Sequence, residues 1–403
     1  MLAIDGGAPV RKTPWPASGP EITTEDAEAV AAVVRSRQLW RYGGHQVRDL
    51  EAAFATLHGV PATAVVASTS GTAAVHLAIG AIDPEPGDEI IVPPITDFGT
   101  VIPVLAQNAV PVFADVRPDT YCLDPEDVAL RISPRTRAIL AVHLFGQPCD
   151  LQALGQIASA HGCALIEDCA QAPLADVGGQ PVGTFGDFGC FSLQQSKHIT
   201  SGEGGLTIAR APARAERARL FADKGWPREG GERTHMFLGL NYRMTELQGA
   251  VALAQVSRLR DIVARRQAVA AGLDAALTGL PGVTLPQLPE GARSAYWMYP
   301  FNVEGGAARF AAAVRAEGVP LASGYVQPLY LVPALRQRRT YGASGFPFDS
   351  PYARPQPAFE PGLCPNAERM TGHLCYLPLH QGLTEQDVDD VGTAVAKVAR
   401  ALQ

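Results

Sequence analysis

The first half of the chain alternates short apolar runs with longer segments whose apolar positions repeat every three or four residues. The short runs predict strands, and the longer segments predict helices. The predicted strands are 64–68, 89–93, 110–116, 137–144, 163–168, 187–194 and 206–209, and the helices between them are 73–81, 96–107, 125–132 and 151–161. This alternation favours a mostly parallel sheet that helices cover on both faces.

The flanking segments complete a two-domain picture. Helices are predicted at 22–37, 47–57, 244–277, 307–317 and 384–402, a strand at 296–303, and a Pro- and Gly-rich loop at 335–370. We therefore expect an α/β protein with an irregular N-terminal arm at 1–20 and a large domain at 21–255. The large domain contains a seven-stranded, mostly parallel sheet sandwiched by helices, and a smaller α+β domain follows at 256–403.

The composition narrows the class of protein. The 403 residues are 47% hydrophobic and 18% charged, which is typical of a globular fold, and the net charge of -7 argues against nucleic acid as a partner. No apolar run reaches the roughly 20 residues that span a membrane, and residues 1–11 lack the apolar core of a signal peptide. The seven cysteines form no CxxC pair, so we expect no metal site and a cytoplasmic, reduced protein.

Lys197 is the first candidate for chemistry. The chain has only four lysines and uses arginine nearly everywhere else, yet Lys197 stands where a predicted strand meets the glycine-rich turn 202–205. A primary amine can form a Schiff base with an aldehyde, whereas a guanidinium cannot. A surface lysine in a loop is the plain alternative, and only the neighbouring motifs decide against it.

The segment Ser70-Gly71-Thr72 follows the first predicted strand and opens a helix. Free backbone N–H groups at a helix N-terminus, next to a small residue, can bind a phosphate. Ser192, five residues before Lys197, is placed to add a further phosphate contact. Many strand–helix turns contain Ser and Gly for packing alone, so this motif is weak by itself.

Asp168 ends the apolar strand 163–168. A buried carboxylate needs a cationic partner, and the protonated nitrogen of a pyridine ring would serve. Gln171, three residues further on, could reach the same ligand. For Asp168 the alternative is a helix cap or an aspartate paired with an arginine. Asn241, which precedes the predicted helix 244–277 and could also contact a ligand, has a helix cap as its alternative.

Together these motifs resemble the sugar aminotransferases of the DegT/StrS family, which are pyridoxal phosphate enzymes of fold-type I. The resemblance covers nearly the whole chain. It is carried by Gly6–Arg11, Ser70–Ala74, Glu167–Ala172, the Ser-x4-Lys-x4-Gly-x-Gly-Gly pattern from Ser192 to Gly205, and Asn241–Met244. The segments 37–40 and 325–330 resemble the branch that contains the scyllo-inosose aminotransferases and 3-amino-5-hydroxybenzoate synthase.

The resemblance implies a role for each matched residue. Lys197 would hold the cofactor aldehyde and move protons, and Asp168 would hold the pyridinium; these two are the expected catalytic residues. The phosphate would be bound at Ser70, Gly71, Thr72 and Ser192, the ring would lie beside Gln171, and Asn241 would reach the cofactor of the opposite subunit. The last role implies a homodimer with its active sites at the interface.

One position departs from the family pattern. The family has an aromatic residue after the threonine of a Pro-x-x-Thr segment, where it stacks on the pyridine ring. In this chain Asp97 occupies that position and Phe98 stands one residue further on. We count Asp97 among the cofactor-binding residues, and either Phe98 takes over the stacking or the ring is covered in another way.

The predicted function is transamination from L-glutamine or L-glutamate to a ketone on a sugar or cyclitol, in antibiotic or related secondary metabolism. Phe98, His198, Arg243 and Tyr325 are the candidates for substrate contacts. Relatives that dehydrate sugars carry His in place of the lysine, but the spacing from Ser192 puts Lys197 in that position. A dehydratase, oxidase or aromatising enzyme with the same cofactor remains an alternative, as does a non-catalytic regulator that keeps the fold.

Overall fold

The computed structural model describes residues 1–228, 233–355 and 358–402. Within these ranges, seven strands form a central sheet in the order β1-β9-β8-β5-β4-β2-β3. They are β1 (Val65–Ser68), β2 (Glu89–Val92), β3 (Val110–Phe113), β4 (Thr136–Val142), β5 (Ala164–Asp168), β8 (Phe188–Ser192) and β9 (Gly205–Ala209). Strand β9 is antiparallel to both neighbours and the other pairs are parallel, which confirms the predicted sheet.

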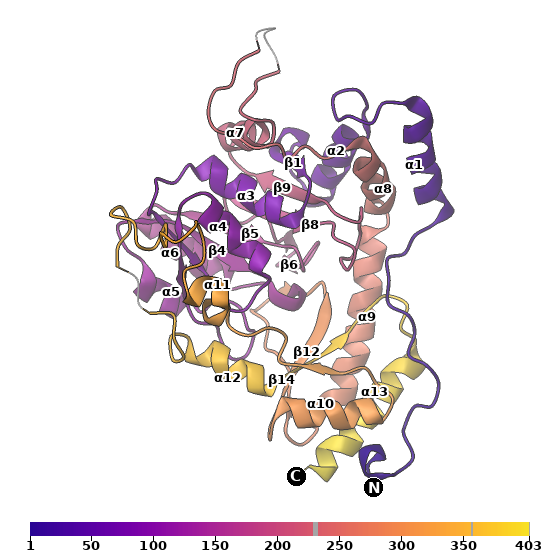
Figure 1. Cartoon of the computed structure of the whole chain (residues 1–403). Helices are drawn as coiled ribbons and strands as arrows, with labels where there is room; N and C mark the ends of the chain where they lie inside the picture. Colours follow the sequence, from indigo (N-terminus) through magenta and orange to yellow (C-terminus); the bar gives the residue numbers. More distant parts are fainter. Residues whose placement is uncertain (229–232, 356–357, 403) are drawn as a thin grey trace.

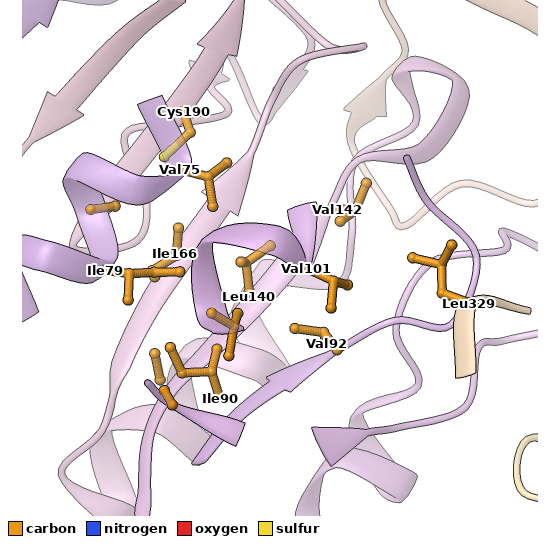
Figure 2. Close-up of a cluster of buried hydrophobic side chains, with 14 of the residues drawn as sticks. Val75, Ile79, Ile90, Val92, Val101, Leu140, Val142, Ile166, Cys190 and Leu329 are labelled. Atoms are coloured by element: carbon orange, nitrogen blue, oxygen red, sulfur yellow. The ribbon is translucent and has the colours of Figure 1, made fainter. Parts of the chain in front are cut away.

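Both faces of the central sheet are buried under helices. Ile90 and Val92 of β2 belong to one core cluster, whereas Ile91 between them belongs to another. Figure 2 shows the first cluster, in which side chains of α3 and of the central strands converge with Leu329 from the C-terminal half. Because neighbouring strand residues point to opposite faces, a strand covered on both sides carries an unbroken apolar run, as β2 does from Ile90 to Val92.

The helices divide between the two faces of the sheet. The first cluster contains residues of α3 (Gly71–Ile82), α4 (Ile102–Ala106) and α7 (Pro212–Ala222). The second contains residues of α2 (Gln46–His58), α5 (Pro125–Arg131), α6 (Leu151–His161), α8 (Glu246–Val256) and α9 (Leu259–Leu277). Helix α1 (Thr24–Ser36) packs against α8. The predicted helical sandwich is confirmed.

Three elements differ from the sequence prediction. The segment 96–107 is not one helix, because the Asp97 side chain caps the short 3-10 helix η3 (Phe98–Thr100) and α4 starts only after it. The segment 244–277 forms α8 and α9, which are separated at residues 257–258. Helix α7 was not predicted, although Pro212 at its first turn is a helix-start signal.

The C-terminal half builds a second, antiparallel sheet in the order β10-β12-β14-β13. Its strands are β10 (Val283–Thr284), β12 (Met298–Val303), β13 (Ala322–Ser323) and β14 (Leu374–Pro378). They share a third core cluster with α9, α10 (Ala307–Ala316) and α13 (Glu385–Ala401). Figure 1 shows α9 running from the central sheet towards this smaller sheet, with both chain termini beside α13.

Short elements complete the fold. The strands β6 (Asp176–Val177), β7 (Gln180–Pro181) and β11 (Ala292–Arg293) form a small third sheet. The further 3-10 helices are η1 (Ala3–Asp5), η2 (Ala62–Ala64), η4 (Leu144–Gly146) and η5 (Leu329–Leu331). The N-terminal arm, irregular apart from η1, binds α13 through Arg11, whose guanidinium lies 2.6 Å from Asp387 and 2.9 Å from Asp390.

The predicted loop at 335–370 is wrong at both ends. Helix α11 (Pro333–Arg336) overlaps its start, and α12 (Pro365–His373) begins before its end. Pro365 lies in the first turn of α12, where a missing backbone N–H costs nothing, so proline starts this helix instead of breaking it. Leu329, Tyr330 and Met370 pack into the first core cluster of the large sheet. The domain boundaries at 20/21 and 255/256 remain predictions.

No helix among the described residues is both long enough and apolar enough to cross a bilayer.

Candidate active site

A cavity of about 350 Å³ lies at the carboxyl ends of β1, β5 and β8. In α/β sheets this edge is where ligands bind. Of the residues predicted from sequence, those that line it are Ser70, Gly71, Thr72, Asp97, Asp168, Gln171, Ser192, Lys197 and Tyr325. The fold thus brings together residues that are separated by up to 255 positions in the chain.

The N-terminus of α3 forms one end of the cavity. The Ser70 hydroxyl caps this helix by accepting a hydrogen bond from the Ala73 N–H at 3.0 Å. A Cβ atom on Gly71 would lie 2.7 Å from the Cβ of Ser192, so only glycine allows β8 to approach the helix this closely. The first-turn N–H groups and the helix dipole favour an anion here. The hydroxyls of Ser70, Thr72 and Ser192 surround the same point.

Asp168 lies on the inner wall of the cavity and is 6% exposed. Its Oδ2 accepts a hydrogen bond from the Thr100 hydroxyl at 2.9 Å, and its Oδ1 accepts one from the Ala170 N–H at 3.0 Å. Burial raises the pKa of this carboxyl above its usual value, although both hydrogen bonds and the nearby Lys197 charge oppose the shift. A cation inside the cavity would therefore be strongly favoured next to Asp168.

Lys197 follows β8, in the turn closed by a hydrogen bond from its own N–H to the Gln194 carbonyl. Its Nζ lies 4.4 Å from the centroid of the Trp297 ring. Burial lowers the pKa of the Lys197 amine, while the carboxylates of Asp168 and Asp97 counteract this effect. A lowered pKa increases the fraction of free amine, which is the form that acts as a nucleophile or base.

Gln171 links the large sheet to the C-terminal half. Its Oε1 accepts a hydrogen bond from the Phe145 N–H at 2.6 Å, and its Nε2 donates one to the Tyr325 hydroxyl at 3.1 Å. Burial raises the pKa of Tyr325 to about 12, so the phenol remains protonated at neutral pH. The backbone of Phe145 has a φ of 59°, a left-handed conformation that non-glycine residues seldom adopt. In this conformation its N–H donates to Gln171.

Four predicted residues do not line the cavity. Phe98 is half-buried and packs against the first core cluster, so it does not replace the missing aromatic. His198 is buried, and its Nε2 donates to the Ala295 carbonyl at 2.9 Å. Arg243 is ion-paired with Asp223, and Asn241, which is exposed, forms a backbone bridge to the same Asp223.

Three of the cavity residues that were not predicted from sequence contact or adjoin the candidate catalytic groups. Thr100 binds Asp168 from a segment predicted as plain helix, Trp297 faces Lys197 from just before β12, and Glu203 lies at the glycine-rich turn. Glu203 belongs to the quoted motif and could have been found from it. Trp297 carries no sequence signal, because only the packing of the C-terminal half on the large sheet brings it to Lys197.

The arrangement fits pyridoxal 5'-phosphate. The cofactor presents an aldehyde, a basic ring nitrogen and a phosphate. The cavity offers a partner to each of these groups. The amine of Lys197 suits the aldehyde, the buried carboxyl of Asp168 suits the ring nitrogen, and the N-terminus of α3, where Gly71 allows close approach, suits the phosphate.

Comparison with known proteins identifies the chain. The model of the DegT/DnrJ/EryC1/StrS aminotransferase family matches residues 20–396. The chain belongs to this family. As a member of the DegT/DnrJ/EryC1/StrS family, it is an aminotransferase, and the predicted enzyme class is confirmed.

Individual relatives cover most of the chain. It is 39% identical to the L-glutamine:2-deoxy-scyllo-inosose aminotransferase of Streptomyces kanamyceticus, with 85% of each protein covered. It is 34% identical to a putative L-glutamine:3-amino-2,3-dideoxy-scyllo-inosose aminotransferase of Streptoalloteichus tenebrarius, over 99% of this chain and 98% of the relative.

Solved structures of the family superpose over nearly the whole chain. The crystal structure of 3-amino-5-hydroxybenzoic acid synthase has a TM-score of 0.85 at 28% identity, covering 97% of this chain and 100% of the other. An aminotransferase from Streptoalloteichus hindustanus has a TM-score of 0.82 at 31% identity, covering 95% and 98%. These matches confirm the fold-type prediction and the predicted resemblance to the scyllo-inosose and hydroxybenzoate branch.

Proposed function

We propose that the protein transfers the amino group of L-glutamine or L-glutamate to a ketone on a sugar or cyclitol, with pyridoxal 5'-phosphate bound in the cavity at Lys197. The observation that carries this proposal is that Lys197 and Asp168 line one cavity together with the N-terminus of α3. When bound, the cofactor supplies an electron sink for the carbon that gains or loses the amino group.

Each side chain contributes a separate task. Ser70, Thr72 and Ser192 bind the phosphate with the helix N-terminus, and Gly71 provides the room for it. The Asp168 carboxylate keeps the ring nitrogen protonated. Lys197 would hold the cofactor covalently and, when released, its amine would move the proton between the substrate carbon and the cofactor as general base and acid.

The relatives support both substrates. Their names give L-glutamine as the amino donor and a scyllo-inosose, which is a cyclitol ketone, as the acceptor. A reaction in antibiotic or related secondary metabolism is the corresponding biological setting. A cytoplasmic location is part of the proposal.

A homodimer is a further part of the proposal. Trp40, Tyr42 and Leu238 leave 50%, 41% and 88% of their surfaces exposed, and Met236 leaves 64%. Tyr42 donates a hydrogen bond to Asp223, which is bridged to Asn241, so these apolar side chains adjoin the Asn241 segment. Exposed apolar surface of this kind is typical of a protein interface. A second copy that covers it would bring Asn241 to the neighbouring cavity.

An absorbance spectrum tests the proposed function. The purified protein with added cofactor should show a band near the visible edge, and L-glutamine should convert it to a band at shorter wavelength. The Lys197→Ala variant should lack the first band. The control variant Lys12→Ala should behave as the wild type, because Lys12 is an exposed residue of the N-terminal arm. A band that ignores glutamine, glutamate and alanine would contradict the assigned donor.

A further inference from the structure

The wall of the cavity carries more negative than positive charge. Among the described residues that line it, Asp97, Asp168 and Glu203 are acidic, and Lys197 is the single cation. Asp168 accepts hydrogen bonds from Thr100 and Ala170, and in the proposed function its charge would be matched by the ring nitrogen of the cofactor. The excess charge therefore comes from Asp97 and Glu203.

Asp97 is held in place by its own backbone segment. Its Oδ1 accepts a hydrogen bond from the Gly99 N–H at 2.7 Å and caps η3. A Cβ atom on Gly99 would lie 2.5 Å from the Thr72 hydroxyl oxygen, so the Asp97 turn packs directly against the start of α3. This hydrogen bond favours the conformation in which the Asp97 carboxylate lines the cavity.

The second oxygen of Asp97 is available to a ligand. Within the described residues, Oδ2 of Asp97 accepts no hydrogen bond and the carboxylate is in no salt bridge. Its negative charge nevertheless acts across the cavity. It raises the pKa of Lys197, against the lowering effect of burial, and it adds to the effect of burial that raises the pKa of Tyr325. Because Asp97 lines the same cavity as Lys197 and Tyr325, a substrate bound there can contact its carboxylate.

From this geometry we propose that Asp97 selects the acceptor by pairing with an ammonium group on it. The preferred acceptor is then a cyclitol or sugar ketone that already carries an amine. This inference rests on the proposed function and specifies its substrate class. A neutral polyol offers the Asp97 carboxylate a hydroxyl donor, whereas an ammonium group offers an N–H donor and a full opposite charge.

The test compares two ketones that differ by one amine. With saturating L-glutamine, kcat/KM is measured for 2-deoxy-scyllo-inosose and for 3-amino-2,3-dideoxy-scyllo-inosose. The wild type should prefer the amino ketone by about tenfold, the discrimination of one charge-assisted hydrogen bond. Asp97→Asn, which keeps the shape of the side chain, should lose this preference through a lower kcat/KM for the amino ketone alone. Glu203→Gln removes the other excess carboxylate of the cavity and leaves the Asp97 turn intact; it is the matched control and should keep the preference.

A pH profile and a binding measurement separate selection from a structural role. The preference of the wild type should decline as pH rises through the pKa of the substrate ammonium, and that of Asp97→Asn should not. With the cofactor first converted to its amino form by L-glutamine, so that no aldehyde can react with an amine, calorimetric titration should show that cis-1,3-diaminocyclohexane binds the wild type about tenfold more tightly than cis-1,3-cyclohexanediol does. This difference should be lost in Asp97→Asn.

Three results would overturn the inference. A wild type that prefers the neutral ketone contradicts it, and so does an Asp97→Asn variant that slows both ketones equally. If neither ketone is turned over although the spectral response to glutamine is normal, the proposed acceptor class itself is wrong. This outcome differs from the second one, in which both ketones react but Asp97→Asn slows them equally.

Discussion

The two faces of β5 carry neighbouring carboxylates in opposite situations. Glu167 is 0% exposed, and its four hydrogen bonds come from the N–H groups of Gly183, Phe185 and Gly186 and from His143 Nε2. His143 Nδ1 accepts from the Cys149 N–H, so the proton on Nε2 points to Glu167. Glu167 thus fastens the loop before β8 to the sheet. The Glu167 carboxylate therefore has its hydrogen-bond partners within the chain.

Asp168, the next residue, faces the cavity with two hydrogen bonds and a raised pKa. The comparison separates structure from function. A buried carboxylate whose hydrogen bonds are all made within the chain stabilises the fold. A buried carboxylate at a strand end that has fewer hydrogen-bond partners is a candidate ligand-binding group.

The largest effect is expected when the ligand-facing carboxylate loses its charge. Asp168→Asn should lower turnover by about 10²- to 10³-fold, since an amide cannot hold the ring nitrogen in its protonated form. Its free energy of unfolding without cofactor should not fall, because the asparagine buries no charge. Turnover within a few fold of wild type would break the distinction between the two carboxylates.

Glu167→Gln should show the opposite pattern. The new amide would direct N–H groups at backbone N–H donors, and we expect the free energy of unfolding to drop by about 2–3 kcal/mol, measured by urea denaturation. The folded protein should still respond spectrally to cofactor and glutamine as the wild type does. A loss of that response in properly folded Glu167→Gln would show that both carboxylates act on the ligand.

The smallest expected effect is a pH dependence of stability in the cofactor-free protein. A carboxyl whose folded pKa is raised contributes stability that is complete below its unfolded pKa, near 3.8, and is lost as pH rises through the folded pKa. The wild type should therefore become less stable relative to Asp168→Asn as pH rises through this window. Denaturation curves at several pH values measure this, and a constant difference between the two proteins would contradict it.

The sequence predicted Asp168 but not the role of Glu167. Asp168 stood out because a carboxylate ending an apolar strand needs an explanation. Glu167 lies within the same nearly continuous apolar strand and gave no separate signal. Three of its hydrogen-bond partners are backbone N–H groups 16 to 19 residues further on. Backbone donors of a loop leave no signature in a sequence.

The same limit applies to the rest of the molecule. Periodicity predicted the strands of the central sheet, because burial on both faces fixes their residue types. It did not predict Trp297 at Lys197, which depends on how two halves of the chain pack. The Pro-rich segment 335–370 was predicted as loop although Pro365 starts α12, and the start signal that Pro212 gives to α7 was not used.

One measurement tests the central claim most directly. Cofactor-loaded protein is given L-glutamine carrying a nitrogen isotope label on its α-amino group, together with a scyllo-inosose ketone, and the products are quantified by mass spectrometry. We predict labelled aminocyclitol and the 2-oxo acid of glutamine in equal amounts, with neither formed by Lys197→Ala. A ketone that is dehydrated or oxidised without gaining the label would contradict the assignment of this cavity to amino transfer.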